Sequence, residues 1–249
     1  METLKVGLEL EAPFETTDQL YWLERNAPRK GAPVPVSGEA AVYHQDGVSL
    51  EIAQTCAYDT AYEAVDNLRA AFEAAQQTIG LGQWPLGWGN FIPAGIFLPR
   101  VRELGCEPDI KVTRSGEARV RRAPMAVRES AWRDSGCHIN IDLPEPIRAD
   151  LGHLVPGLAD PMVQAQCASH PGVVGIVWGF QEMLREHYPE LQNPQGRTWY
   201  RSPGLCRMKT NGTMVWVELR SAPSVILADA VRASSFISNV QTLASTIIS

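Results

Sequence analysis

Four short stretches of the chain alternate strictly between apolar residues and residues that bind metals or phosphates. They are residues 6–11 (VGLELE), 48–52 (VSLEI), 137–142 (CHINID) and 215–220 (VWVELR). Because successive side chains of a β-strand point to opposite faces, each stretch would have one apolar face and one chemically functional face. The alternation therefore predicts four strands, each with one face suited to packing and one suited to chemistry.

The polar positions of these strands are unusually acidic. If the strands share a sheet, one surface collects Glu9, Glu11, Glu51, Asp142 and Glu218 together with His138 and Arg220. Carboxylates crowded in a cleft repel one another strongly, and a divalent cation offsets that repulsion. A solvated sheet face is the alternative, but Glu and Asp are depleted in ordinary strands. We therefore expect a metal site on this surface.

A group of cations precedes the last of these strands. Arg197, Arg201, Arg207 and Lys209 fall within thirteen residues, and the last two are spaced as neighbours on one strand face would be. Guanidinium and ammonium groups directed at one place suit phosphate oxygens. Beside a carboxylate-bound metal, they predict a nucleoside triphosphate held by cations on one side and by Mg²⁺ on the other.

Helix signals lie between the strand signals. Thr60 and Glu63 form a capping box before a helix with an apolar stripe that ends at Gly80. Asp160-Pro161 is typical of a helix start; this helix is interrupted at residues 170–172, and a second helix runs to about His187. The residues from Ser224 onward read as a buried helix.

The order of these elements is too irregular for a βαβ repeat. It predicts the α+β class, with a mainly antiparallel sheet and helices on its apolar face. No linker divides the chain, so we expect a single catalytic domain over residues 1–249. Residues 26–38 and 83–99 read as loops. Residues 111–133 read as a solvated basic loop, which could also receive an acidic or polyphosphate ligand.

Composition narrows the function classes. The net charge of −6 argues against nucleic acid as the main partner. No apolar run approaches the roughly 20 residues of a membrane span, and the acidic N-terminus is unlike a signal peptide. Five cysteines without a C-x-x-C pair suggest neither a disulfide framework nor structural zinc. We therefore expect a cytoplasmic protein without a membrane partner.

Five motifs together resemble one family. They are GLELE (7–11), DGVSLE (46–51), GCEPD (105–109), SGCHINI (135–141), and YRSPGLCRMKTNG (200–212) followed by VELRS (217–221). In this order, through nearly the whole chain, they resemble the phage-type carboxylate–amine ligases (amidoligases), which are related to glutamine synthetase and glutamate–cysteine ligase. The resemblance implies the curved antiparallel sheet of those catalytic domains, with helices packed on one face.

The resemblance also implies ATP-dependent amide formation through an acyl phosphate, with Mg²⁺ or Mn²⁺. It marks Glu9, Glu11 and Glu51 as metal ligands, and His138 and Glu218 as ligands of a metal nearer the transferred phosphate. Arg201, Arg207 and Lys209 are implied as the phosphate clamp, and Arg220 acts with Glu218 in catalysis by neutralising developing charge.

Three further residues are implied near the substrate. Asp46 and Asp109 are candidate contacts to the substrate amine, although a structural role in a turn is the alternative for each. Asn140 stands where many relatives have a second histidine, in the pattern GHIHI. An amide can bond nucleotide or substrate but is a poorer metal ligand, which leaves the number of metals open.

The expected partners are small-molecule or peptide carboxylates and amines. Glutamine synthetase-like sheets often complete their sites at subunit contacts, so a homo-oligomer remains open, and a phage-encoded chain would act in the host cytoplasm. Two alternatives stay beside the ligase: a phosphotransferase acting on a carboxylate or guanidino group, and an inactive nucleotide- or metal-binding module.

Overall fold

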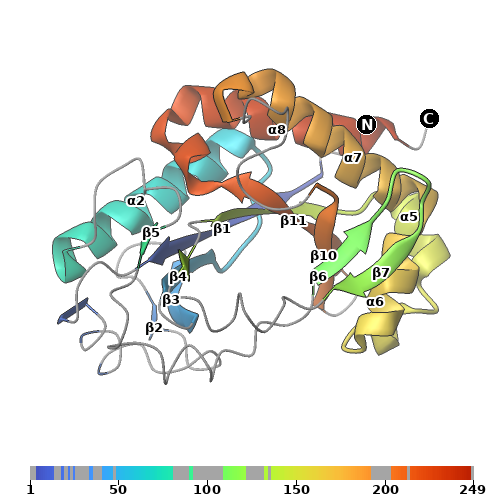
Figure 1. Ribbon diagram of the computed structural model, residues 1–249, viewed down its shortest axis with the longest axis horizontal. Helices are drawn as coiled ribbons and strands as arrows, with labels where there is room; N and C mark the ends of the chain where they lie inside the picture. The colour runs from blue at the N-terminus through green and yellow to red at the C-terminus, as the bar shows by residue number, and fades with distance from the viewer. Residues whose placement is uncertain are drawn as a thin grey trace.

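Antiparallel strand pairing organises the α+β fold of this protein (Figure 1). The computed structural model describes residues 4–13, 18–19, 22, 25, 34–35, 41–46, 49–80, 90–91, 109–121, 132–133, 136–191, 203–211 and 214–247. Within them, nine strands form one open sheet in the order β2-β3-β4-β1-β9-β11-β10-β6-β7, and every neighbouring pair is antiparallel. The α+β class and the antiparallel sheet are confirmed.

The strands of the large sheet are short to medium in length. They are β1 (Val6–Pro13), β2 (Val34–Pro35), β3 (Ala41–Asp46), β4 (Ser49–Gln54), β6 (Asp109–Val112), β7 (Ala118–Arg121), β9 (Gly136–Asp142), β10 (Leu205–Asn211) and β11 (Met214–Pro223). A separate pair consists of β5 (Asn90–Phe91) and β8 (Trp132–Arg133). All four alternating stretches of the sequence therefore lie in strands of one sheet, namely β1, β4, β9 and β11.

Five α-helices are described, and α2, α7 and α8 lie over one face of the sheet (Figure 1). Their bounds are α2 (Ala61–Ile79), α5 (Glu145–Leu151), α6 (Pro161–Ala168), α7 (Pro171–His187) and α8 (Ala230–Thr246), with 3₁₀ turns at Val155–Gly157, Pro189–Leu191 and Ser224–Ala228. No helix within the described ranges is both long and apolar enough to cross a membrane.

The predicted helix starts are confirmed by their caps. The Thr60 hydroxyl oxygen accepts the Glu63 N–H at 3.2 Å and donates to the Glu63 carboxylate at 2.8 Å. Gly80 ends α2 in the left-handed conformation, at φ 72°. An Asp160 carboxylate oxygen likewise accepts the Met162 N–H at 2.8 Å at the start of α6. Local side-chain chemistry thus sets both boundaries.

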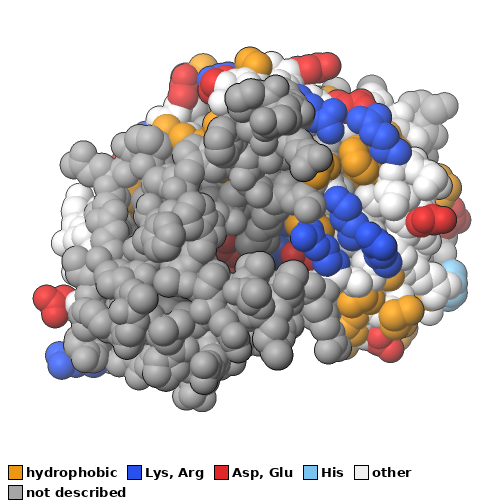
Figure 2. All heavy atoms as spheres, in the orientation of Figure 1, with side chains coloured by type: hydrophobic (Ala, Val, Ile, Leu, Met, Phe, Trp, Pro, Cys, Tyr) orange, Lys and Arg blue, Asp and Glu red, His pale blue; other side chains and the backbone are white. Residues whose placement is uncertain are grey.

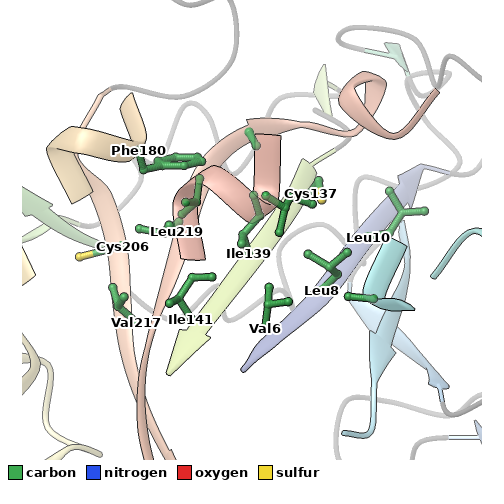
Figure 3. Packing of buried hydrophobic residues seen from close by; sticks show 14 of the residues in the cluster. Val6, Leu8, Leu10, Cys137, Ile139, Ile141, Phe180, Cys206, Val217 and Leu219 are labelled. Carbon is green, nitrogen blue, oxygen red and sulfur yellow. The ribbon is translucent and has the colours of Figure 1, made fainter. Parts of the chain in front are cut away.

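The apolar halves of the alternating strands form the core beneath the helices. Leu8 and Leu10 of β1, Ile139 of β9 and Leu219 of β11 are fully buried and point to the same side as Phe180 of α7 (Figure 3). Burying each such side chain contributes about 1.5–3 kcal/mol. Because the strand period is two, this packing fixes which residues point to the opposite face.

Three segments that read as loops contain strand residues. Val34–Pro35 pairs with β3, and Asn90–Phe91 pairs with Trp132–Arg133. The larger correction concerns residues 109–121, whose first and last four residues form the β6–β7 hairpin rather than a basic loop. The hairpin extends the sheet because β6 pairs with β10.

Gly204 couples this hairpin to β10, and its replacement gives a testable prediction. Its φ is 78°, and a Cβ there would lie 2.3 Å from the Val112 carbonyl oxygen. We expect Gly204→Ala to lower the free energy of unfolding by about 3 kcal/mol or more, because strain at φ adds to a backbone clash. Denaturant-induced unfolding of the variant and the wild type measures this change in the free energy of unfolding.

The matched control is Gly80→Ala. Gly80 has a similar φ of 72°, but a Cβ there meets nothing within 4 Å. This variant should lose only about 1 kcal/mol from the strain at φ. Equal losses in the two variants would contradict the role given to the contact with Val112.

Candidate metal and anion site

The register of the central strands brings the polar residues into rows across one face of the sheet. Glu9 of β1 lies opposite His138 of β9, and Glu218 of β11 lies opposite both Asn140 of β9 and Arg207 of β10. The pairs that involve β9 join segments far apart in sequence. The predicted convergence of acids on one face is therefore present in the structure.

Glu9, His138 and Glu218 form the closest group. One ligand atom from each lies within 4.8 Å of the others. His138 Nδ1 is 3.4 Å from Glu9 Oε2 and 3.6 Å from Glu218 Oε1. Glu218 is completely buried and His138 is 1% exposed. Two carboxylates and an imidazole are ligands that divalent metals accept, so this group is the candidate metal site.

Two cations contact the same carboxylates. Lys209 Nζ donates to Glu9 Oε1 at 2.9 Å and pairs with Glu218. The Arg220 guanidinium also pairs with Glu218, and its Nη1 lies 3.4 Å from His138 Nδ1. Lysine and arginine therefore supply part of the charge neutralisation that the sequence pattern assigned to metal alone.

These contacts keep both carboxylates ionised. Burial and the nearby Glu218 raise the pKa of Glu9, but the hydrogen bond with His138 and the charge of Lys209 outweigh them and lower it to about 2. Burial also raises the pKa of Glu218, but Arg220 and Lys209 hold it well below its usual range. Both side chains are therefore anionic at neutral pH.

Asp109 joins the two arginines of the site. Its Oδ1 is 2.8 Å from Arg220 Nε and 3.6 Å from Arg207 Nε. The register of β11 against β9 shifts between Leu219 and Ala222, so β11 carries one extra residue beside Arg220. Bulges of this kind commonly redirect a side chain next to a functional site. Asp109 thus holds the guanidinium groups, and its contacts are those of a positioning residue.

Glu11 and Glu51 lie at the edge of the cluster. They are direct cross-strand partners on β1 and β4, and both are buried. Glu11 Oε1 is 3.4 Å from His138 Nε2 and 3.9 Å from Arg220 Nη2. The structure therefore brings Glu9 together with His138 and Glu218, whereas the family resemblance grouped it with Glu11 and Glu51.

The residues present fit a divalent cation. Five carboxylates (Glu9, Glu11, Glu51, Asp109 and Glu218) and three cations (Arg207, Lys209 and Arg220) make up this cluster, so its acidic side chains outnumber its cations by two. The Asn140 side chain donates to Glu9 Oε1 at 3.1 Å, but its own Oδ1 is buried and has no hydrogen-bond partner among the described residues. Charge and an available acceptor both favour a bound cationic ligand.

Three other predicted positions are not among the described members of this group. Arg201 is outside the described residues. Asp46 ends β3, opposite Ser49, and only its backbone is described. Asp142 is buried on the same face of β9, opposite Trp216, and is not a member of the close Glu-His-Glu group.

Comparison with known proteins adds no identification. No protein-family model matches the chain, and neither the curated proteins nor the solved structures gave a match. The resemblance to the amidoligases therefore stays a prediction from the motifs.

Proposed function

We propose that the protein is an ATP- and Mg²⁺-dependent carboxylate–amine ligase of the amidoligase type. The observation that carries the proposal is the buried group of Glu9, His138 and Glu218 beside Lys209 and Arg220. The order of the five sequence motifs supports the same conclusion. The finer fold expectation, a curved sheet like that of glutamine synthetase and glutamate–cysteine ligase, belongs to this proposal.

In the proposed reaction a substrate carboxylate attacks the γ-phosphorus of ATP, which releases ADP and leaves an acyl phosphate. An amine then attacks the acyl carbon, and inorganic phosphate leaves as the amide forms. Glu9, His138 and Glu218 would hold a divalent metal, which when bound neutralises charge on phosphate oxygens. Mn²⁺ is the alternative ion to Mg²⁺.

The chain's own cations have separate tasks in this scheme. Arg207 and Lys209 bind phosphate oxygens, and Arg220 neutralises charge on the transferred phosphoryl group. Asp109 keeps Arg220 and Arg207 in place before the ligand arrives. Because the guanidinium groups are already oriented, no free energy is spent on reorienting them when charge develops in the reaction.

Product analysis tests the proposal. Pairs of carboxylates and amines are incubated with ATP and Mg²⁺, and ADP, phosphate and amide are measured. The ligase predicts ADP and amide only when both substrates are present. ADP formed with a phosphorylated acceptor and no amine would instead identify a phosphotransferase. Binding of Mg-ATP without turnover across the panel would identify an inactive module.

A further inference from the structure

A second group of cations lies on the β6–β7 hairpin, beside the candidate site. Lys111 and Arg119 are direct cross-strand partners, and Arg121 lies opposite Asp109. Because Asp109 contacts Arg207 and Arg220, alternation places Lys111, Arg119 and Arg121 on the face of the sheet that carries the site. We call these three residues the hairpin cations. Figure 2 shows Lys and Arg side chains gathered in this region, over β6, β7 and β10.

The hairpin cations lack carboxylate partners among the residues that the structure describes. Lys111 donates to the Pro203 carbonyl oxygen, and Arg119 is exposed. Asp109 forms its ion pairs with the two arginines of the site, and Glu117 in the turn pairs with none of the three. Burial lowers the pKa of Lys111, and the like charges of Arg121 and Arg119 lower it further. The hairpin part of this face is therefore short of negative charge.

Arg114, at the tip of the same hairpin, provides a contrast. Its guanidinium is 2.9 Å from Glu182 Oε1 and lies over the Trp178 ring at 4.7 Å. Both partners are on α7, which covers the opposite face of the sheet. Arg114, on the helix side of the hairpin, thus has a carboxylate partner, whereas the hairpin cations have none among the described residues.

The spacing of the strands sets the size of a ligand that touches both regions. β7 is three strands from β11, which carries Glu218. Neighbouring strands are about 4.8 Å apart, so the separation is about 14 Å. An extended polypeptide covers that distance with about four residues. A free amino acid is too short to reach from β7 to β11, although Lys111 on β6 is only two strands from β11.

We propose that the hairpin cations bind acidic side chains of an extended polypeptide, so that the carboxylate activated at the site belongs to a peptide or protein. The assignment of the substrate rests on the proposed ligase function. The positive charge of the hairpin favours an acidic partner, and the distance from β7 to the site favours a polypeptide chain. Residues 109–121 contain no aromatic side chain on which bases could stack, and the net charge is −6, so both observations favour polypeptide over single-stranded nucleic acid.

Fluorescence anisotropy with a labelled deca-glutamate peptide tests the binding, without ATP or metal. We expect binding that weakens with salt, and little binding of a deca-glutamine peptide. The variant Lys111→Gln/Arg119→Gln/Arg121→Gln should bind about tenfold more weakly, from three lost exposed charge pairs. Arg114→Gln should bind like the wild type. If the triple variant fails to fold, Arg119→Gln alone should weaken binding about twofold.

The proposal would be overturned if the folded triple variant bound the deca-glutamate peptide with wild-type affinity. It would also be overturned if the wild type bound a labelled dA₁₂ oligonucleotide more tightly than the peptide and the triple variant did not bind that oligonucleotide. A second experiment measures turnover. It compares ADP formation with peptide and amine to ADP formation with free glutamate and amine. Peptide binding without any turnover would reject the ligase and keep the binding surface. Turnover of free glutamate that matches turnover of the peptide would reject the polypeptide substrate and keep the ligase.

Discussion

Glu218→Gln is expected to lower the free energy of unfolding by about 3–5 kcal/mol, because it leaves the buried Arg220 and the partly buried Lys209 without their carboxylate. Glu218 is completely buried and pairs with both Lys209 and Arg220. Removing it also relieves repulsion with Glu9, which acts in the opposite direction. The low pKa of Glu218 shows that attraction dominates, since the fold favours its charged form.

The measurement is thermal and denaturant unfolding of Glu218→Gln beside the wild type. Lys209→Met/Glu218→Gln, which removes one cation together with the acid, should recover part of the loss. Mg²⁺ should raise the melting temperature of the wild type but not that of Glu218→Gln, because ligand binding stabilises only the chain that binds it. A Glu218→Gln variant as stable as the wild type would show that the buried charge contributes no net stability.

Arg220→Lys is expected to reduce kcat of the proposed ligase by about 10²–10³-fold, because the planar fork of arginine is lost at the developing charge. The Arg220 guanidinium reaches Glu218 through Nη1 and Asp109 through Nε. Lysine keeps the positive charge near Glu218 but cannot contact both carboxylates in this way. Arg220→Lys should therefore lower kcat strongly and the free energy of unfolding only slightly.

Single-turnover kinetics and thermal unfolding separate the two effects. Arg148→Lys is a matched control, because Arg148 forms its ion pair with Glu145 on α5, away from the site. It should leave turnover unchanged. If Arg220→Lys retained wild-type kcat, Arg220 would have no part in stabilising the transferred phosphoryl group.

Much of the fold could be predicted because its signals are local. The alternation in β1, β4, β9 and β11 has a period of two, and the residues Val65, Leu68 and Phe72 of the α2 stripe are buried as expected. The β6–β7 hairpin was missed, although DIKV and ARVR each alternate around a TRSGE turn. The density of cations there favoured a loop, and it concealed the strand period.

The partners within the site depend on register, which local signals do not specify. The sequence placed Glu9, Glu11 and Glu218 on one face, but only strand pairing sets Glu9 against His138. For the same reason the ion pairs of Asp109 with Arg220 and Arg207 could not be foreseen, and its predicted role as an amine contact or a turn residue stays a prediction. The bulge beside Arg220 also had no signal in the sequence.

The proposal that Glu9, His138 and Glu218 hold a divalent cation is tested by Mn²⁺ binding, measured by electron paramagnetic resonance. Glu9→Gln is the informative variant because Lys209 keeps its contact with Glu218. Asp142→Asn is the control, since Asp142 is a buried acid on the same face outside the group. If these three residues hold the cation, Mn²⁺ should bind to the wild type and to Asp142→Asn, and the affinity of Glu9→Gln should be at least about tenfold weaker. Equal affinity in Glu9→Gln and the wild type would contradict the proposal.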